Sequence, residues 1–161
     1  MKIILFAFLL TSMNLNAQWV IKNVKNGFDD PYKICYNESR KGTILKMEDI
    51  GKSENDTSGF KTPSLYITNF YFCTKKPEIA ILLIVNGEQK KYECFGLLSA
   101  DNKTCFINFF FYTNDYWTNQ FYKDFKNASK IKIRINDLIC GESIHEFNMI
   151  GSSKAVDFLQ N

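Results

Sequence analysis

The stretch Gly151-Ser152-Ser153-Lys154 combines residue types that could cradle a phosphate or carry a serine nucleophile. A phosphate-binding P-loop needs a glycine directly before a lysine that serine or threonine follows, and here Ala155 follows the lysine. A Ser-x-x-Lys pair needs serine three residues before the lysine, and that position is Gly151. We therefore interpret the segment as the start of a short C-terminal helix, with Ser152 or Ser153 as its N-cap.

The candidates for acid–base chemistry are few. His145 is the only histidine, so a hydrolase that uses a histidine base would have to use it. It stands beside Glu146 in a predicted strand, where an exposed position is as consistent as any other. One histidine without a ligand-spaced cluster also disfavours a zinc enzyme. Acidic pairs such as Asp29-Asp30 point to opposite faces of a strand, so they form no dyad by sequence. We predict no catalytic residues, no metal site and no cofactor.

An aromatic cluster is the one candidate for ligand binding. Tyr112, Tyr116 and Trp117 occur where a predicted strand gives way to a helix, with Asn114 and Asp115 between them. Flat aromatic side chains beside polar groups can stack on sugar rings. The alternative is that Trp117 belongs to the core and that the tyrosines line its rim.

The cysteines and the N-terminus both point to export. The first residues combine Lys2, an apolar run at 3–10 and the small residue Ala17, which predicts a signal peptide cleaved after Ala17. The apolar run is far shorter than the roughly 20 residues that span a bilayer. The protein would then be periplasmic or secreted, without a membrane span after signal removal. Some cysteines should pair there, and an odd number leaves at least one unpaired: Cys35, Cys73, Cys94, Cys105 and Cys140.

The charge balance excludes one class of partner. The chain carries 20 Lys and Arg against 17 Asp and Glu, a formal net charge of +3. Only Arg40 and Arg134 are arginines, and the lysines are scattered along the chain. A nucleic-acid-binding protein normally shows a concentrated basic surface, so we expect no nucleic-acid partner.

These residues must be positioned by a mainly β fold. Residues 79–85 form an unbroken apolar run that predicts a strand buried on both faces. Asn86-Gly87 then predicts a tight hairpin turn. Trp117, Phe121 and Phe125 recur at helical spacing within 116–128. Further short strands are expected at 19–21, 32–36, 44–47, 65–72, 92–97, 104–112, 130–136 and 144–149.

We therefore predict one domain over 18–161 after a signal peptide at 1–17. Its fold class is mainly β: an antiparallel β-sandwich with one crossing helix and a short C-terminal helix. In that last helix, Ala155, Phe158 and Leu159 share one face and can close the core.

Residues 79–159 resemble a loose group of small exported bacterial proteins, the type VI secretion-associated (VasI-like) and invasion-associated-locus-B-like families. The shared outline is a strand run followed by Ser99-Ala100-Asp101, a helix leading into a basic strand, and an ending of the form Phe-x-Met-x-Gly-Ser, here from Phe147. Where such families place a tryptophan after the meander turn, this chain has Cys94-Phe95. The resemblance implies a β-sandwich and carries over no catalytic residue.

The functional expectation is an exported, non-catalytic binding or accessory protein of the bacterial cell envelope, whose partner is an unknown envelope protein or glycan. One alternative is a carbohydrate- or peptidoglycan-binding module that uses Tyr112, Tyr116 and Trp117. Another is an inhibitor or immunity protein against a secreted hydrolase or toxin.

Overall fold

The described strands of the protein form one antiparallel sheet. The computed structural model describes residues 18–25, 31–49, 63–109 and 115–161, with the side chains of residues 115–118 excepted. The described strands pair in the order β1-β2-β3-β4-β7-β6-β5-β8-β9. Their bounds are β1 Val20–Val24, β2 Tyr32–Glu38, β3 Ile44–Glu48, β4 Ser64–Thr68, β5 Glu78–Val85, β6 Glu88–Leu98, β7 Thr104–Asn108, β8 Ala128–Asp137 and β9 Gly141–Asn148. Helix α1 spans Asp115–Asn127 and helix α2 spans Ser152–Gln160. The predicted mainly antiparallel β fold with two helices is confirmed.

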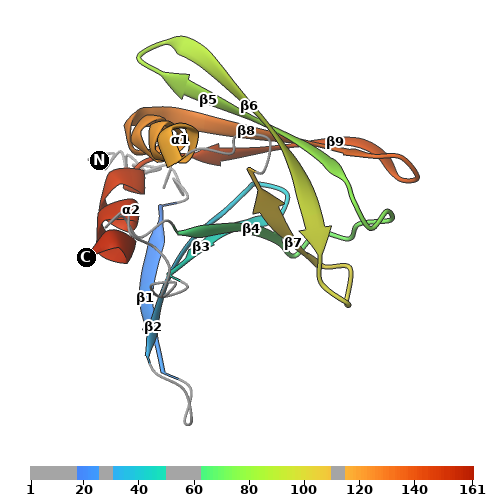
Figure 1. The fold of residues 1–161 in the computed structure, drawn as a ribbon, viewed down its shortest axis with the longest axis horizontal. Helices are drawn as coiled ribbons and strands as arrows, with labels where there is room; N and C mark the ends of the chain where they lie inside the picture. The colour runs from blue at the N-terminus through green and yellow to red at the C-terminus, as the bar shows by residue number, and fades with distance from the viewer. Residues whose placement is uncertain (1–17, 26–30, 50–62, 110–114) are drawn as a thin grey trace, which may run out of the picture.

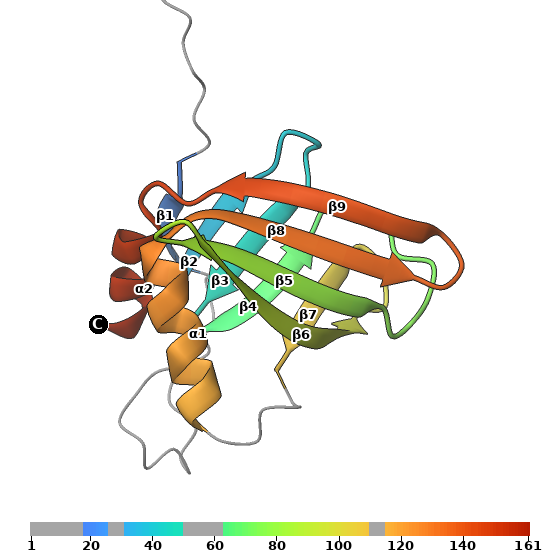
Figure 2. The same cartoon turned by 90° about the horizontal axis from the view of Figure 1, so that it is seen from above.

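The sheet folds over on itself to make two layers. One layer holds β1 to β4, and β5, β8 and β9 form the other (Figures 1 and 2). The long strand β6 joins them, because it pairs with β5 as far as Phe95 and then with β7 from Phe95 to Leu98. The two layers therefore belong to one continuous sheet, with β1 and β9 as its edges.

Gly96 lies at the point where β6 passes from one layer to the other. Its N–H donates to the carbonyl of Pro77 at 3.0 Å. A Cβ at this position would lie 2.2 Å from the Cys105 sulfur and 2.9 Å from the Pro77 ring. Glycine is thus required here because β6 bends against its neighbours more closely than any side chain allows.

The end of β2 and the loop after it approach the edge strand β9 through side chains. Asn37, at the end of β2, donates its amide N–H to the carbonyl of Asn148 in β9 at 2.5 Å. Lys41 donates to the carbonyl of Ile144 at 3.0 Å. These bonds hold the end of β2 and the β2–β3 loop against β9.

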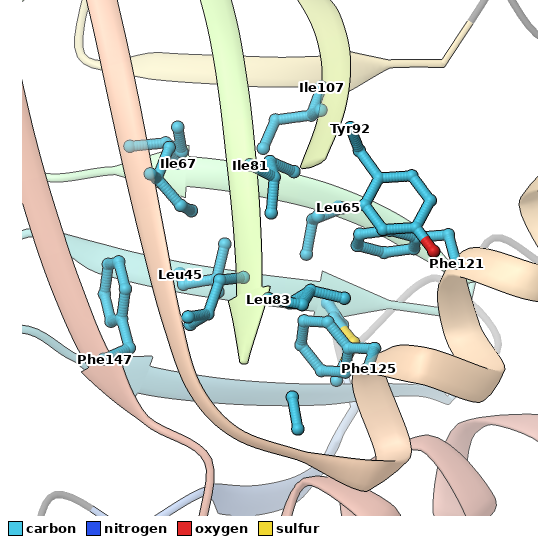
Figure 3. Packing of buried hydrophobic residues seen from close by; sticks show 14 of the residues in the cluster. Leu45, Leu65, Ile67, Ile81, Leu83, Tyr92, Ile107, Phe121, Phe125 and Phe147 are labelled. Carbon is cyan, nitrogen blue, oxygen red and sulfur yellow. The ribbon is translucent and has the colours of Figure 1, made fainter. Parts of the chain in front are cut away.

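The core lies between the two layers and under α1. Figure 3 shows Leu45, Leu65 and Ile67 of one layer facing Ile81 and Leu83 of the other. Phe121 and Phe125 of α1 enter the same core and are fully buried, as the helical spacing predicted. The core residues that are 2 % exposed or less also include Cys35, Met47, Phe72, Ile79, Cys105, Ile107, Ile131, Ile133, Ile135, Phe147, Ala155, Val156 and Leu159.

The predicted strand β5, between β6 and β8, is confirmed, but only one of its faces is fully buried. Ile79, Ile81, Leu83 and Val85 point into the core, and the residues between them are half-buried. The prediction of burial on both faces is wrong because the second face of β5 lies on the outside of the layer. There, Lys132 and Lys91 flank it from the neighbouring strands in register with Leu82. The aliphatic stems of such lysines cover apolar surface while their ammonium groups stay in water.

Two strands end earlier than their sequence patterns predicted. The strand expected at 65–72 stops at Thr68, because Asn69 adopts a left-handed conformation with φ 59°. The strand expected at 104–112 stops at Asn108, and residues 110–112 lie outside the described part of the chain. The Asn86-Gly87 turn is confirmed, with φ values of 52° and 84° that suit a tight hairpin.

The C-terminal helix is confirmed, but its predicted serine cap is wrong. Gly151 occupies the N-cap position with φ 87°, and no side chain caps the helix. Ser152 instead donates its hydroxyl to the Lys126 carbonyl at 3.3 Å, and Ser153 donates to the Asp157 carboxylate. Glycine takes the cap because the sharp exit from β9 needs a left-handed residue there. The core contacts of α2 come from Ala155, Val156 and Leu159, and Phe158 packs at their margin.

Candidate functional site

The β8–β9 turn exposes two large aliphatic side chains. β8 ends at Asp137, β9 begins at Gly141, and Leu138, Ile139 and Cys140 connect them. Leu138 is 82 % exposed and Ile139 is 75 % exposed, the two highest values among the large apolar side chains described as exposed. The turn projects at the end of the molecule opposite α1 and α2 (Figures 1 and 2). We call residues 137–141 the hairpin tip.

A buried carboxylate fixes the conformation of the hairpin tip. Asp137 is only 2 % exposed and accepts four backbone hydrogen bonds. One oxygen takes the N–H groups of Ile139 and Cys140, at 3.0 and 3.1 Å. The other takes those of Cys73 and Thr74, at 2.7 and 3.0 Å. Desolvation of this buried group opposes its ionisation, but the four donors outweigh desolvation and lower the pKa of Asp137 to about 2.

A disulfide makes the second connection between the hairpin tip and the rest of the molecule. Cys73 and Cys140 are bonded, with their Cα atoms 5.8 Å apart and a sequence separation of 67. The bond joins the segment after β4 to the turn after β8. Asp137 bridges the same two segments, so the tip is held by one covalent link and four hydrogen bonds.

The prediction of an odd, unpaired cysteine is confirmed. Cys35, Cys94 and Cys105 are buried thiols. Burial raises the pKa of each to about 12, with the nearby Glu93 carboxylate adding to the effect at Cys94. A thiol reacts as its thiolate, so these three groups are chemically inert at neutral pH.

Cys73, Asp137 and Cys140 are the only group of three potential metal ligands close together within the described residues. Their ligand atoms lie within 4.8 Å of one another. The two sulfurs, however, are bonded to each other, and the Asp137 oxygens each accept two N–H groups. In the oxidised protein this group therefore holds the turn and offers a cation no thiolate ligand.

The segment that carries Cys73 exposes further residues beside the hairpin tip. Tyr71, two residues before the disulfide, is 62 % exposed. Lys75 and Lys76, two and three residues after it, are also exposed. The disulfide thus brings an aromatic residue and two basic residues to the region that presents Leu138 and Ile139.

His145 is buried, contrary to the exposed position that the sequence allowed. It is 4 % exposed, its ring packs edge-on against Phe70 at 4.9 Å, and its Nε2 lies 3.1 Å from the Ser143 hydroxyl. Burial, together with the positive charge of Lys41, lowers its pKa. The ring points inward because β9 alternates, so that His145 shares the inner face with Phe147. A side chain in this position cannot reach an external substrate.

The aromatic candidates from the sequence are placed only in part. Tyr112 lies outside the described residues, and Tyr116 and Trp117 belong to the first turn of α1, where side chains are not described. The neighbouring Tyr122 is buried, its hydroxyl donates to the Pro63 carbonyl, and desolvation raises its pKa. Tyr122 is therefore a core residue, and the sugar-stacking role of the other three stays a prediction.

The acidic residues on the strands form ion pairs along the outer face of the sheet. Glu146 contacts Lys132 at 2.9 Å and Glu142 contacts Arg134 at 3.8 Å. An open hollow of about 670 Å³ lies on this face over Ala80, between Glu93, Phe95 and Arg134. A second, of about 440 Å³, lies between the β2–β3 loop and β9. Both hollows are open and rimmed by charges of both signs, so neither defines a ligand by its chemistry.

Comparisons of the chain with known protein families, curated proteins and solved structures gave no match. The resemblance to VasI-like and invasion-associated-locus-B-like proteins therefore stays a prediction. Within the described residues, no helix is long and apolar enough to cross a membrane.

Sequence reasoning missed the hairpin tip. The signal was present as Asp137-Leu138-Ile139-Cys140-Gly141, a turn with aliphatic residues at its centre. Turns normally carry Gly, Asn, Asp, Ser or Pro, so two aliphatic residues there contradict local turn chemistry. Such a contradiction is itself a reason to suspect binding.

Proposed function

We propose that the protein is an exported, non-catalytic binding protein of the bacterial cell envelope and that the hairpin tip is its recognition element. The observation that carries the proposal is the pair Leu138 and Ile139, which are exposed on a turn held by a disulfide and a buried carboxylate. Exposed apolar side chains cost solubility and give nothing to the core. Fixing them in one conformation lowers the entropy lost on binding.

Export is supported by two independent features. The N-terminal segment has the pattern of a signal peptide. The Cys73–Cys140 bond is of the kind that persists in oxidising compartments. We therefore expect a periplasmic or secreted protein that begins at Gln18.

A non-catalytic role is supported by the position of His145. The ring is buried against Phe70, with a lowered pKa, so the only histidine of the chain is no accessible base. The three free thiols are buried and protonated. Carbohydrate binding and inhibition of a secreted hydrolase remain predictions from the sequence.

Retention in the envelope tests the proposal. The full gene is expressed in a bacterium, the N-terminus of the product is sequenced, and the protein is followed through cell fractionation. We expect a chain beginning at Gln18 that sediments with the envelope, and we expect the double variant Leu138→Ser/Ile139→Ser to appear in the soluble fraction.

The matched control is Ile150→Ser. Ile150 is also an exposed aliphatic residue in a turn, 54 % exposed, but it lies at the other end of β9. Its variant should fractionate like the wild type. Equal fractionation of all three proteins, or an unprocessed chain kept in the cytosol, would contradict the proposal.

A further inference from the structure

We infer that the hairpin tip binds a phospholipid surface by shallow insertion of Leu138 and Ile139. This inference rests on the proposed function and specifies its partner. The β8–β9 turn projects at one extremity of the molecule (Figures 1 and 2). A projecting pair of aliphatic side chains can insert into a surface that deforms around it, and the boundary between headgroups and acyl chains is such a surface.

The polar groups of the hairpin tip are suited to this environment. Backbone N–H groups that enter a lipid surface without partners carry a large penalty. Here the N–H groups of Ile139 and Cys140 already donate to Asp137, as do those of Cys73 and Thr74. The turn can therefore leave water without breaking a hydrogen bond of any of these four groups.

The residues around the hairpin tip match the chemistry of a headgroup region. Tyr71 is an exposed aromatic residue with a polar end, the type that concentrates at membrane interfaces. Lys75 and Lys76 are exposed in the same segment and can approach lipid phosphates. Next to the tip, Glu142 contacts Arg134 at 3.8 Å, so its negative charge is partly compensated.

Glu78 is the remaining exposed acid close to the two lysines in the sequence, and it accepts a hydrogen bond from the Asn136 amide at 3.1 Å. The three positive charges of Lys75, Lys76 and Arg134 are thus balanced by the three negative charges of Glu78, Glu142 and the buried Asp137. These charges give no net attraction to an anionic surface, so the two aliphatic side chains must supply the affinity.

The protein purified after export is tested by co-sedimentation with vesicles that contain equal parts of phosphatidylglycerol and phosphatidylcholine. We expect the wild type to bind and Leu138→Ser/Ile139→Ser to bind about 100-fold more weakly, roughly tenfold for each aliphatic side chain lost from the lipid. The control variant Ile150→Ser also loses one exposed aliphatic side chain, but away from the hairpin tip, and it should bind the vesicles like the wild type. Added salt and pure phosphatidylcholine should change binding little, because the charges around the tip balance.

The membrane inference is overturned if the wild type does not bind these vesicles, or if the tip variant binds as well as the wild type. If the wild type fails to bind vesicles but its envelope retention still depends on Leu138 and Ile139, the partner is a protein or glycan and the proposed function survives. If retention does not depend on the tip either, both proposals fail.

Discussion

Two hairpin turns of the same sheet are built in opposite ways. The β5–β6 turn consists of Asn86 and Gly87, whose positive φ values let the chain reverse without any long-range contact. The β8–β9 turn places Leu138 and Ile139 in water, and Asp137 and the disulfide to Cys73 hold it. Both turns support the fold, but only the second also keeps two exposed aliphatic side chains that contribute little to the core. This combination is the basis of our proposal that the second turn serves binding.

Of the changes to these two turns, removal of the disulfide should lower the free energy of unfolding most. We expect Cys73→Ser/Cys140→Ser to lower the free energy of unfolding by about 4 kcal/mol, because the bond closes a long loop in the unfolded chain. Urea denaturation of the oxidised proteins measures the difference. Reduction of the wild type should reproduce the loss, and an unchanged midpoint would show that the covalent restraint contributes nothing to folding.

Removal of the Asp137 carboxylate should cause the second largest loss of stability. Asp137→Ala leaves four N–H groups without their acceptor, and we expect it to lower the free energy of unfolding by about 3 kcal/mol. Asp137→Asn keeps an oxygen acceptor and should cost less. Glu142→Ala, an exposed acid on the same hairpin, is the matched control and should change stability by less than about 0.5 kcal/mol. Equal effects at the two positions would contradict the restraint described here.

The same carboxylate predicts a dependence on pH. The pKa of Asp137 falls from the ordinary 3.8 to about 2 on folding, so the unfolded chain binds more protons between these values. The stabilisation is therefore complete above about pH 4 and is lost as the pH falls towards 2. Thermal unfolding of wild type and Asp137→Asn across this range should converge at the acid end, and parallel curves would exclude this role.

A substitution in the β5–β6 turn should lower the free energy of unfolding less. Gly87→Ala puts a side chain at φ 84°, where no atom stands within 4 Å of the new Cβ, so strain in the backbone is the only cost. We expect the free energy of unfolding to fall by about 1 kcal/mol. Chemical denaturation checks this value, and a loss as large as that of Asp137→Ala would remove the distinction between the two turns.

The smallest effect on stability belongs to the hairpin tip itself. Leu138→Ser/Ile139→Ser removes side chains that are 82 % and 75 % exposed, so the free energy of unfolding should change by less than about 0.5 kcal/mol. Denaturation of the same purified protein that is used for binding gives this number. A loss of several kcal/mol would mean that the tip is part of the folded core.

The difference between the turns also explains what the sequence could predict. Asn86-Gly87 is a local pattern and was found directly. The β8–β9 turn is held by contacts with a remote segment: Asp137 accepts a hydrogen bond from Cys73, 64 positions away in the sequence. Because five cysteines allow many pairings, the sequence does not show which cysteine bonds to Cys140. Most strands and both helices followed from periodicity, because alternation and helical spacing are also local.

The site was harder to predict than the fold. His145 could have been placed inside, since residues 145, 147 and 149 alternate towards the core and Ile144 points out. The Gly151 cap shows the opposite case: a serine is the usual N-cap, but the exit from β9 requires positive φ there. At both positions the surrounding strand or turn determines the conformation, and the intrinsic preference of the single residue does not.

Photo-crosslinking in intact cells tests directly whether the β8–β9 turn contacts a binding partner. A photoreactive phenylalanine derivative is placed at position 138 or, as the control, at position 150 of the exported protein. We predict a strong adduct with an envelope component from position 138 and none from position 150. Equal labelling from both positions, or none from position 138, would contradict the claim that the clamped apolar turn is where this protein binds.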